Sequence, residues 1–494
     1  MADAPSAPTA SSGVASAEWL AGGPGGADRL AQLLPAALRG MAAGTAERGG
    51  PVPAGGPAAV AATLARTQSA DGLPRHGVGA EQALEELSAL LAAGSADPGD
   101  PACAAHLHCP PLAVSVAADV VASALNPSMD SWDQAPVASE IEREFATGIA
   151  RLCYPDAARP DAVITSGGTE SNLLGLLLAR ESAVTRPVCG ANSHHSVARA
   201  AWLLGLPAPV VVPCVDDRMV PSALAEALGP LGAQAVVVAT AGTTNTGRID
   251  PLPEIAEICR RTGARLHVDA AYGGLALCSE TLRSRLAGLE LADSVALDLH
   301  KFGWQPVAAG VFAARGEADL QALTVRAEYL NADDDTEAGL PDLLGRSLRT
   351  SRRPDAFRMA VTLRALGTAG IGALVERCCA NASGVHAMVE DHPALRSWGP
   401  PELSTVVFRP VAADGAAGDE LVAQVRRTLL EDGTAVIGRG SLPTGPDGEA
   451  QLWLKLTLLH PHTQPADYRA LLDAVATVAA DLRTSVTRES PVAS

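Results

Sequence analysis

Lysine is nearly missing from this chain. Among 494 residues it occurs only at positions 301 and 455, and the other 35 of the 37 basic residues are arginines. Arginine can replace lysine in most surface roles, but its guanidinium group keeps its proton in proteins. Each of the two lysines is therefore a candidate for a role that arginine cannot fill.

Long apolar runs and a secretory leader are missing too. No window holds 18 unbroken apolar residues, so we expect no membrane span. The N-terminus has neither the basic start nor the apolar stretch of a signal peptide. Nine cysteines lie at irregular spacing without CxxC pairs, which indicates reduced thiols, a cytoplasmic protein and no metal site. A net charge of −18 argues against a nucleic-acid surface.

The apolar pattern predicts an α/β protein. Residues 1–17, rich in Ala, Ser and Pro, are expected to be a disordered tail, and residues 27–48 and 79–93 are expected to be helices. From about residue 112, helical stretches such as 252–262 alternate with short apolar runs, which predicts a mainly parallel sheet covered on both faces. Residues 320–350 are expected to form a long mobile loop. The expected strands of the sheet are 162–165, 210–213, 235–239, 265–268, 294–297 and 309–313.

Lys301 follows one of these apolar runs, at the point where the strand is expected to end. Most lysines are ordinary surface residues. The run Ala292–Leu297 is too apolar for the surface, however, and ligands in such sheets lie beyond the carboxyl ends of the strands. Removal from water makes a lysine amine less protonated and more nucleophilic, as a lysine that forms a Schiff base requires.

Asp269 also follows an expected strand, in the segment His267–Gly274. Its carboxylate either caps the next turn or faces a cation. The protonated ring nitrogen of pyridoxal phosphate is such a cation, and an aspartate beside it keeps the ring an electron sink. The two alanines after Asp269 would let a flat ring pack closely.

Three polar segments lie near other strand ends. Thr165–Asn172 places glycines and hydroxyls before a helix, an arrangement that either cradles a phosphate or makes an ordinary turn. His194 either stacks on a cofactor ring or satisfies the core. The Gly-Thr-Thr turn within Ala241–Asp250 is either a binding turn or a plain loop.

These motifs occur in a fixed order, and the lysine lies 32 residues after the aspartate. In that order they resemble the group II pyridoxal-phosphate-dependent amino-acid decarboxylases, over about residues 30–480. The resemblance implies fold type I: a large α/β domain, a small α+β C-terminal domain and an N-terminal helical segment. It implies a homodimer with an active site shared between subunits. The expected divisions are 18–110 for dimerisation, 111–355 for the cofactor and 356–494 for the small domain.

The resemblance also implies a role for the residues around the cofactor ring. Lys301 would hold pyridoxal 5'-phosphate covalently, and Asp269 would pair with the ring nitrogen. Ala271 would lie against one face of the ring and His194 against the other.

Further roles concern the phosphate and the proton donor. Tyr329 matches the family's loop tyrosine, which reaches the neighbouring subunit and protonates the substrate carbon after CO2 leaves. If Tyr329 only packs in the loop, His194 is the next candidate. Thr244 would lie near the ring substituents, and the phosphate would be held by Gly168, Thr169 and His300.

Two segments, Ala105–Pro111 and Asn126–Gln134, resemble the diaminobutyrate and lysine decarboxylases and not the aromatic branch. A side-chain ammonium in a closed site needs a carboxylate. Asp130 and Asp133 stand where the family places substrate contacts across the dimer, unless they are helix caps or surface acids, and His108 belongs to the first segment.

The resemblance therefore implies α-decarboxylation of an L-diamino acid: 2,4-diaminobutyrate, lysine or ornithine. The family usually has Asn-Pro where this chain has His460-Pro461, which bears on the substrate and not on the cofactor. The alternatives are an aminotransferase or a decarboxylation-dependent aldehyde synthase on the same fold, and a scaffold without catalysis. Tyr329 favours decarboxylation, and the intact Lys301 and Asp269 argue against a scaffold.

Overall fold

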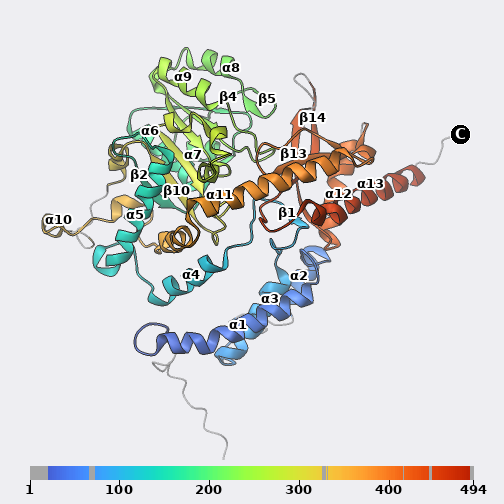
Figure 1. Ribbon diagram of the computed structural model, residues 1–494, viewed down its shortest axis with the longest axis horizontal. Helices are drawn as coiled ribbons and strands as arrows, with labels where there is room; N and C mark the ends of the chain where they lie inside the picture. Colours follow the sequence, from blue (N-terminus) through green and yellow to red (C-terminus); the bar gives the residue numbers. More distant parts are fainter. Residues whose placement is uncertain are drawn as a thin grey trace, which may run out of the picture.

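The computed structural model describes residues 20–65, 73–324, 330, 332–415, 417–443 and 448–489. Two β-sheets form the body of the molecule, and the N-terminal helices extend below it (Figure 1). The expected disordered tail, residues 1–17, and the loop residue Tyr329 lie outside the described residues.

The larger sheet has seven strands in the order β2-β10-β9-β8-β7-β3-β4. All neighbouring strands are parallel except β10, which is antiparallel to both β2 and β9. The mainly parallel sheet is thus confirmed, and six of its strands begin and end within one residue of the prediction. The strands are β2 Asp161–Thr165, β3 Arg186–Gly190, β4 Val210–Val212, β7 Ala235–Thr240, β8 Arg265–Asp269, β9 Ser294–Asp298 and β10 Gly310–Ala314.

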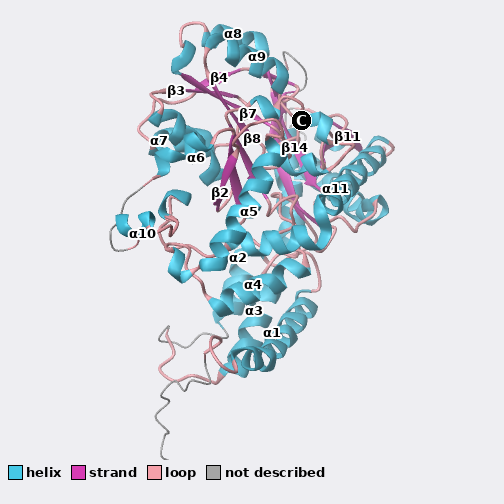
Figure 2. Ribbon diagram, turned by 60° about the vertical axis from the view of Figure 1, so that its left-hand side comes forward, coloured by secondary structure: helices cyan, strands magenta, loops and turns pink. Residues whose placement is uncertain are grey.

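Helices cover both faces of this sheet (Figure 2), because its strands are apolar on both sides. Successive side chains of a strand point to opposite faces. Val163 of β2 therefore packs with Leu174 of α6, whereas Ile164 packs in the cluster that contains Phe145 of α5. One layer contains α6 Gly168–Glu181 and α7 Ser196–Leu203, and the other contains α5 Pro136–Cys153, α8 Pro221–Leu228 and α9 Leu252–Thr262.

Polar residues meet at one edge of the large sheet. Thr165, Asp269 and Asp298 are the last residues of β2, β8 and β9. Because β10 is antiparallel, it begins at this edge, where Gly310 pairs with both Thr165 and Asp298. Turns that follow these strands are therefore brought together, although they are far apart in the sequence.

The smaller sheet has five strands in the order β1-β13-β14-β12-β11. Its first strand comes from the N-terminal part of the chain and pairs in parallel with β13. Val406 and Leu456 lie opposite each other on β12 and β14 and belong to the cluster beneath α12 and α13. The elements are β1 Cys103–Ala104, β11 Leu395–Ser397, β12 Thr405–Pro410, α12 Gly418–Glu431, β13 Val436–Pro443, β14 Ala450–Thr457 and α13 Arg469–Glu489.

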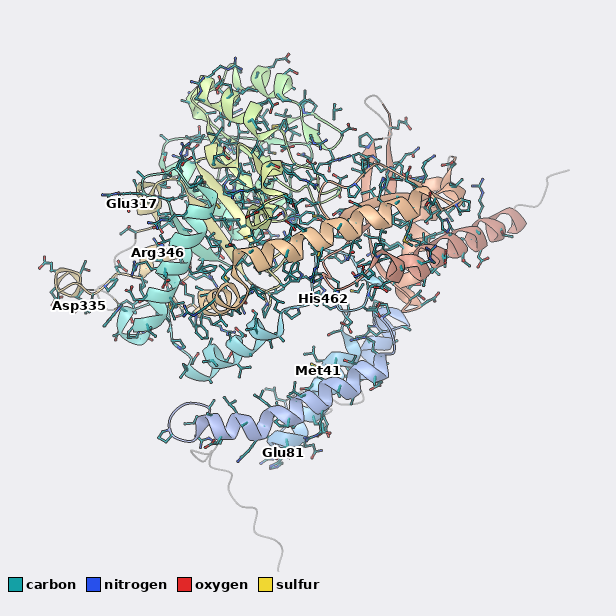
Figure 3. All side chains as sticks on the ribbon, in the orientation of Figure 1. Met41, Glu81, Glu317, Asp335, Arg346 and His462 are labelled. Carbon is teal, nitrogen blue, oxygen red and sulfur yellow. The ribbon has the colours of Figure 1, made fainter. Side chains whose placement is uncertain are left out.

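Two N-terminal helices, α1 (Gly26–Arg48) and α3 (Ala80–Gly94), pack closely side by side. A Cβ atom at Gly40 or at Gly44 would overlap a backbone carbonyl oxygen of α3, so glycine permits this approach. Apolar side chains, among them Met41 (Figure 3), remain exposed on the pair.

The helix α11 (Asp355–Glu390) connects the two sheets. It contacts α4 (Ala113–Leu125) and α5 at one end and β11 and β12 at the other, and Gly367, with φ 66° and ψ 170°, interrupts its helical backbone. Of the described residues, only this helix is long and apolar enough to cross a membrane, and its contacts identify it as a core helix.

The segment 320–350 contains no strand among its described residues. It holds short helices instead, and α10, which carries Asp335, stands away from the body (Figure 3). The short helices of the molecule are α2 Gly56–Ala65, η2 Trp132–Gln134, η3 Gly232–Gln234, η4 Gly274–Cys278, η5 Arg283–Leu286, η6 Leu289–Leu291, η7 Glu317–Leu323, α10 Asp333–Glu337, η8 Leu344–Arg346, η9 Val411–Ala413 and η10 Pro465–Tyr468. The two-residue strands β5 Cys214–Val215 and β6 Arg218–Met219 form a separate ribbon.

Candidate active site

A pocket of about 820 Å³ opens at the polar edge of the large sheet and faces the small sheet. It collects all eight residues that the sequence assigned to the cofactor, although they come from five separate segments at strand ends. Those residues are Gly168, Thr169, His194, Thr244, Asp269, Ala271, His300 and Lys301.

The turn between β2 and α6 forms one end of the pocket. Gly167 has φ +149°, in the region that favours glycine, and a Cβ there would lie 3.0 Å from Cε1 of His300. A Cβ at Gly168 would lie 2.9 Å from Cβ of Ala271. The two glycines therefore keep a space open in front of the N-terminus of α6, which is a favourable position for a phosphate group.

Asp269 closes the buried side of the pocket and is 6% exposed. Its carboxylate accepts a hydrogen bond from Nδ2 of Asn172 at 2.7 Å and another from the backbone N–H of Ala271 at 3.1 Å. These donors fix the carboxylate and leave it able to accept from a cation in the pocket.

Lys301 follows β9 and reaches back to the last residue of that strand. Its Nζ lies 2.9 Å from Oδ2 of Asp298, a buried carboxylate that the sequence analysis did not single out. The other oxygen of Asp298 has no hydrogen-bond partner among the described residues and lies beside the Gly167–Gly168 turn. His300 is held at this turn because its Nδ1 hydrogen-bonds to the carbonyl oxygen of Ala309 at 2.8 Å.

His194 is half-buried and its Nδ1 lies 2.8 Å from Oγ of Ser196. Burial is the main cause that lowers its pKa, and the neighbouring His195 lowers it further, whereas Asp269 acts in the opposite direction. The imidazole is therefore held neutral at neutral pH.

The wall that faces this cofactor side comes from the small sheet, and the sequence analysis missed it. Lys455 is the second of the two lysines; its Nζ donates to the carbonyl oxygen of Thr244 at 2.5 Å. Burial lowers the pKa of Lys455 to about 8, although Asp217 raises it. The rarity of lysine marked Lys455 as a candidate for a special role, but no pattern in the sequence placed it at this pocket. The other lining residues of this wall are His106, Leu107, Arg426, Gly438, Arg439 and Thr457.

The residues assigned to the substrate do not line this pocket within one chain. His108 and Asp133 are exposed, and Asp130 is half-buried. The carboxylate of Asp133 accepts a hydrogen bond from Oγ of Ser131 at 2.5 Å.

A mainly parallel seven-stranded sheet with one antiparallel strand, a small second sheet and a lysine after β9 define the fold-type-I class of pyridoxal-phosphate enzymes. Residues 65–411 match the family model described as "Pyridoxal-dependent decarboxylase conserved domain". The chain therefore belongs to the pyridoxal-phosphate-dependent amino-acid decarboxylases, and it is a carboxy-lyase that uses pyridoxal 5'-phosphate.

Three relatives show which members of the family this chain resembles. The chain is 38% identical to the L-2,4-diaminobutyrate decarboxylase of Rhizobium meliloti, over 84% of this chain and 85% of that protein. It is 33% identical to the enzyme of the same name from Acinetobacter baumannii, over 81% and 84%. A crystal structure of the "glutamate decarboxylase domain of diaminobutyrate-pyruvate transaminase and L-2,4-diaminobutyrate decarboxylase" from Vibrio parahaemolyticus matches with a TM-score of 0.81 at 28% identity. That match covers 94% of this chain and 98% of the other.

The side chains of the pocket fit this cofactor. The Gly167–Gly168 turn leaves space at a helix N-terminus for the phosphate. Asp269 is an anion suited to a protonated ring nitrogen, and Lys301 supplies an amine within the same pocket.

Proposed function

We propose that this enzyme removes the α-carboxylate of an L-diamino acid, with L-2,4-diaminobutyrate as the first candidate and lysine or ornithine as the others. The observation that carries the proposal is the 38% identity to a protein named L-2,4-diaminobutyrate decarboxylase over 84% of the chain. The products are CO2 and the corresponding diamine.

The residues of the sheet side hold the cofactor in this proposal. Lys301 would bind it covalently, Asp269 would face the ring nitrogen, and Ala271 and His194 would lie against the two faces of the ring. The phosphate is held by Gly168, Thr169 and His300, and Thr244 lies near the ring substituents.

When bound, pyridoxal phosphate accepts the electron pair of the broken carbon–carboxylate bond. Asp269 keeps its carboxylate at the ring nitrogen through the donors Asn172 and Ala271. Tyr329 gives a proton to the substrate carbon after CO2 has left, and it does so in the neighbouring subunit. The amine of Lys301 would hold the cofactor covalently in the resting enzyme.

The charges of the pocket indicate that a second subunit completes it. The small-sheet wall carries Arg426, Arg439 and Lys455 and has no carboxylate among its lining residues. These cations suit the α-carboxylate of a substrate but repel its side-chain ammonium. Exposed Asp133, with Asp130 from the same segment and His108 from the segment 105–111, contributes to the partner's pocket, and the two carboxylates supply the missing negative charge.

The N-terminal segment 18–110 joins the two subunits in the proposed homodimer. Apolar side chains on the outside of α1 and α3 are exposed in the single chain, and covering them would favour association. They include Leu34, Leu38, Met41, Leu87 and Leu91. All nine cysteines are free, which supports a cytoplasmic location.

A substrate panel tests this function. Release of CO2 and of amine is measured with added pyridoxal phosphate for diaminobutyrate, lysine, ornithine, glutamate, aspartate and an aromatic amino acid. We expect kcat/KM to be highest for a diamino acid, with equal amounts of CO2 and diamine. Preference for an acidic or aromatic substrate contradicts the proposed substrate class. Consumption of O2 with aldehyde formation supports the aldehyde synthase, and amino transfer to a 2-oxo acid without CO2 supports the aminotransferase.

A further inference from the structure

A buried group of polar side chains lies behind Asp269, and no step described above uses its outer members. At its centre is Asn172 of α6, which is 0% exposed. Nδ2 of Asn172 donates to Oδ2 of Asp269 at 2.7 Å and to Oγ of Ser196 at 2.8 Å. Oδ1 of Asn172 lies 2.9 Å from Nε2 of His267. Both amide N–H groups and the amide oxygen are therefore in use.

The two neighbours of the Asn172 amide, Asp269 and His267, together determine which way it points. His267 is buried on β8, and burial lowers its pKa to about 4, so the ring is neutral at neutral pH and carries one proton. An ionised carboxylate only accepts hydrogen bonds, so Nδ2 of Asn172 must face Asp269 and Oδ1 must face His267. The proton of His267 consequently lies on Nε2, and Nδ1 accepts from the hydroxyl of Ser294 at 2.9 Å.

A glycine in α6 leaves the space that the imidazole ring of His267 occupies. A Cβ at Gly175 in α6 would lie 2.8 Å from Nδ1 of His267 and 2.9 Å from its Cγ. Glycine at that position lets the imidazole reach Asn172 from the neighbouring strand. The position of His267 therefore depends on both β8, which carries it, and α6, whose glycine admits its ring.

The second branch of the group ends at His194. Because Oγ of Ser196 accepts a hydrogen bond from Asn172, its own O–H is free to donate to Nδ1 of His194 at 2.8 Å. The backbone N–H of Ser196 points to the same nitrogen at 3.3 Å. Nδ1 of His194 is therefore an acceptor, and the proton of this imidazole lies on Nε2.

We propose that Asn172 and His267 are positioning residues that fix the two side chains which contact the cofactor ring. His267 holds the amide of Asn172 in one orientation, and that amide holds the carboxylate of Asp269 and, through Ser196, the tautomer of His194. Without the N–H of His267, the amide oxygen of Asn172 loses its donor, and the amide is free to tilt away from Asp269, which weakens the hydrogen bond between them. This inference rests on the proposed function, in which Asp269 faces the ring nitrogen.

The test measures the interaction of the ring nitrogen with Asp269 apart from turnover. Apoenzyme is titrated with pyridoxal phosphate and with the analogue in which C–H replaces the ring nitrogen, and the ratio of the two dissociation constants is compared among variants. The holoenzyme with ¹⁵N-labelled cofactor reports the protonation of the ring nitrogen by its chemical shift. The variants are His267→Leu, which lacks a donor, and His267→Gln, which keeps one at a similar distance.

We expect wild type to prefer the natural cofactor and to hold its ring nitrogen protonated. In His267→Leu, the ratio of the two dissociation constants should fall about tenfold and the ¹⁵N signal should shift towards the unprotonated value. The reason is that the variant weakens a hydrogen bond to a charged group, the carboxylate of Asp269. His267→Gln should keep most of the preference. Ser279→Ala, which removes a buried hydroxyl bonded to Glu376 on another face of the domain, is the matched control and should keep the wild-type ratio.

Two results overturn the inference: an unchanged ratio in His267→Leu, or equal losses in the Leu and Gln variants, which would show a steric role only. If His267→Leu fails to fold, Asn172→Ala takes its place and must show the same loss. Asp269→Asn separates the two claims. If that variant keeps the wild-type ratio, Asp269 does not face the ring nitrogen and the proposed function fails. If it loses the ratio while His267→Leu keeps it, only the positioning role is wrong.

Discussion

The two walls of the pocket differ in the charges that they carry. On the large-sheet wall, Lys301 lies with the carboxylates of Asp269 and Asp298, and its Nζ is 2.9 Å from Asp298. On the small-sheet wall, Arg439 is exposed, and the partners of Lys455 are a carbonyl and an amide oxygen of the Gly-Thr-Thr turn. The first wall is complete within one chain, whereas the second lacks a negative charge for a diamino acid.

The difference separates the chemistry from the recognition of the substrate. The cofactor side needs fixed geometry, which hydrogen-bonded side chains at a buried sheet edge provide. The substrate side must open for exchange, so its side chains come from a second domain, a loop and, as we propose, another subunit. Changes to the first wall should therefore abolish turnover, and changes to the second should alter which substrate is used.

The largest effect is expected for Lys301→Arg. The guanidinium group stays protonated and cannot hold the cofactor covalently, so turnover and the visible absorption band of the bound cofactor should both be lost. Absorption spectra and CO2 release check this, with Lys455→Arg as the control that keeps the cofactor attached. Measurable decarboxylation by Lys301→Arg would contradict the proposal that Lys301 holds the cofactor covalently.

Tyr329→Phe should lower amine formation by about 10²–10⁴-fold, the usual contribution of a general acid. Cofactor binding should persist, and CO2 release should exceed amine formation as the substrate carbon lacks its proton. Amine, aldehyde and CO2 are quantified together. Tyr154→Phe removes a core hydroxyl that has no hydrogen-bond partner among the described residues, and it should leave all three unchanged. Unaltered amine formation in Tyr329→Phe would move the proton donor elsewhere, with His194 the next candidate.

Asp133→Asn should act on the substrate wall. If its carboxylate meets the side-chain ammonium of the substrate in the partner's pocket, KM for the diamino acid should rise about tenfold, or about 1.4 kcal/mol, while kcat changes little. Steady-state kinetics with the diamino acid measure this change. Asp156→Asn, at another exposed carboxylate, is the control. An equal loss of kcat in Asp133→Asn would assign Asp133 to the chemistry instead.

The smallest effect concerns stability at acid pH. The pKa of His267 is about 4 in the folded chain and near 6.5 when unfolded, so below pH 6.5 the unfolded chain binds a proton that the folded chain does not. Stability should therefore fall as pH drops through this window. Urea unfolding at pH 7 and pH 5 should show a loss about 2 kcal/mol larger in wild type than in His267→Gln. Equal losses would contradict a buried neutral imidazole.

Most of the large sheet was predictable because its strands are continuous apolar runs between helices. The exception is β3, which was not predicted because Arg186 and Pro187 interrupt its apolar run. The structure pairs Pro187 with Val236 of β7, whereas the pairing of β3 with β4 begins only at Val188. The antiparallel direction of β10 and the pairing of β1 with β13 depend on tertiary packing, and no local pattern marks them.

The cofactor side of the site was predictable because motif residues directly follow strands. Asp298 was missed because it is the last residue of a strand and looks like part of the next turn. Asn172 was missed as a positioning residue because a polar residue early in a helix is usually a cap. The rarity of lysine marked Lys455, but its place in a cationic wall could not be predicted. Arg426 and Lys455 come from elements whose approach to the pocket depends on how the two domains pack.

Reduction of the holoenzyme with borohydride, followed by peptide mapping, tests the central claim most directly. The reduction fixes the cofactor permanently on the amine that holds it. This chain has two lysines, and both line the same pocket. The labelled peptide therefore shows directly which of the two holds the cofactor. The account predicts the cofactor mass on the peptide that contains Lys301 and none on the peptide that contains Lys455. Labelling of Lys455, or of neither lysine, would contradict it.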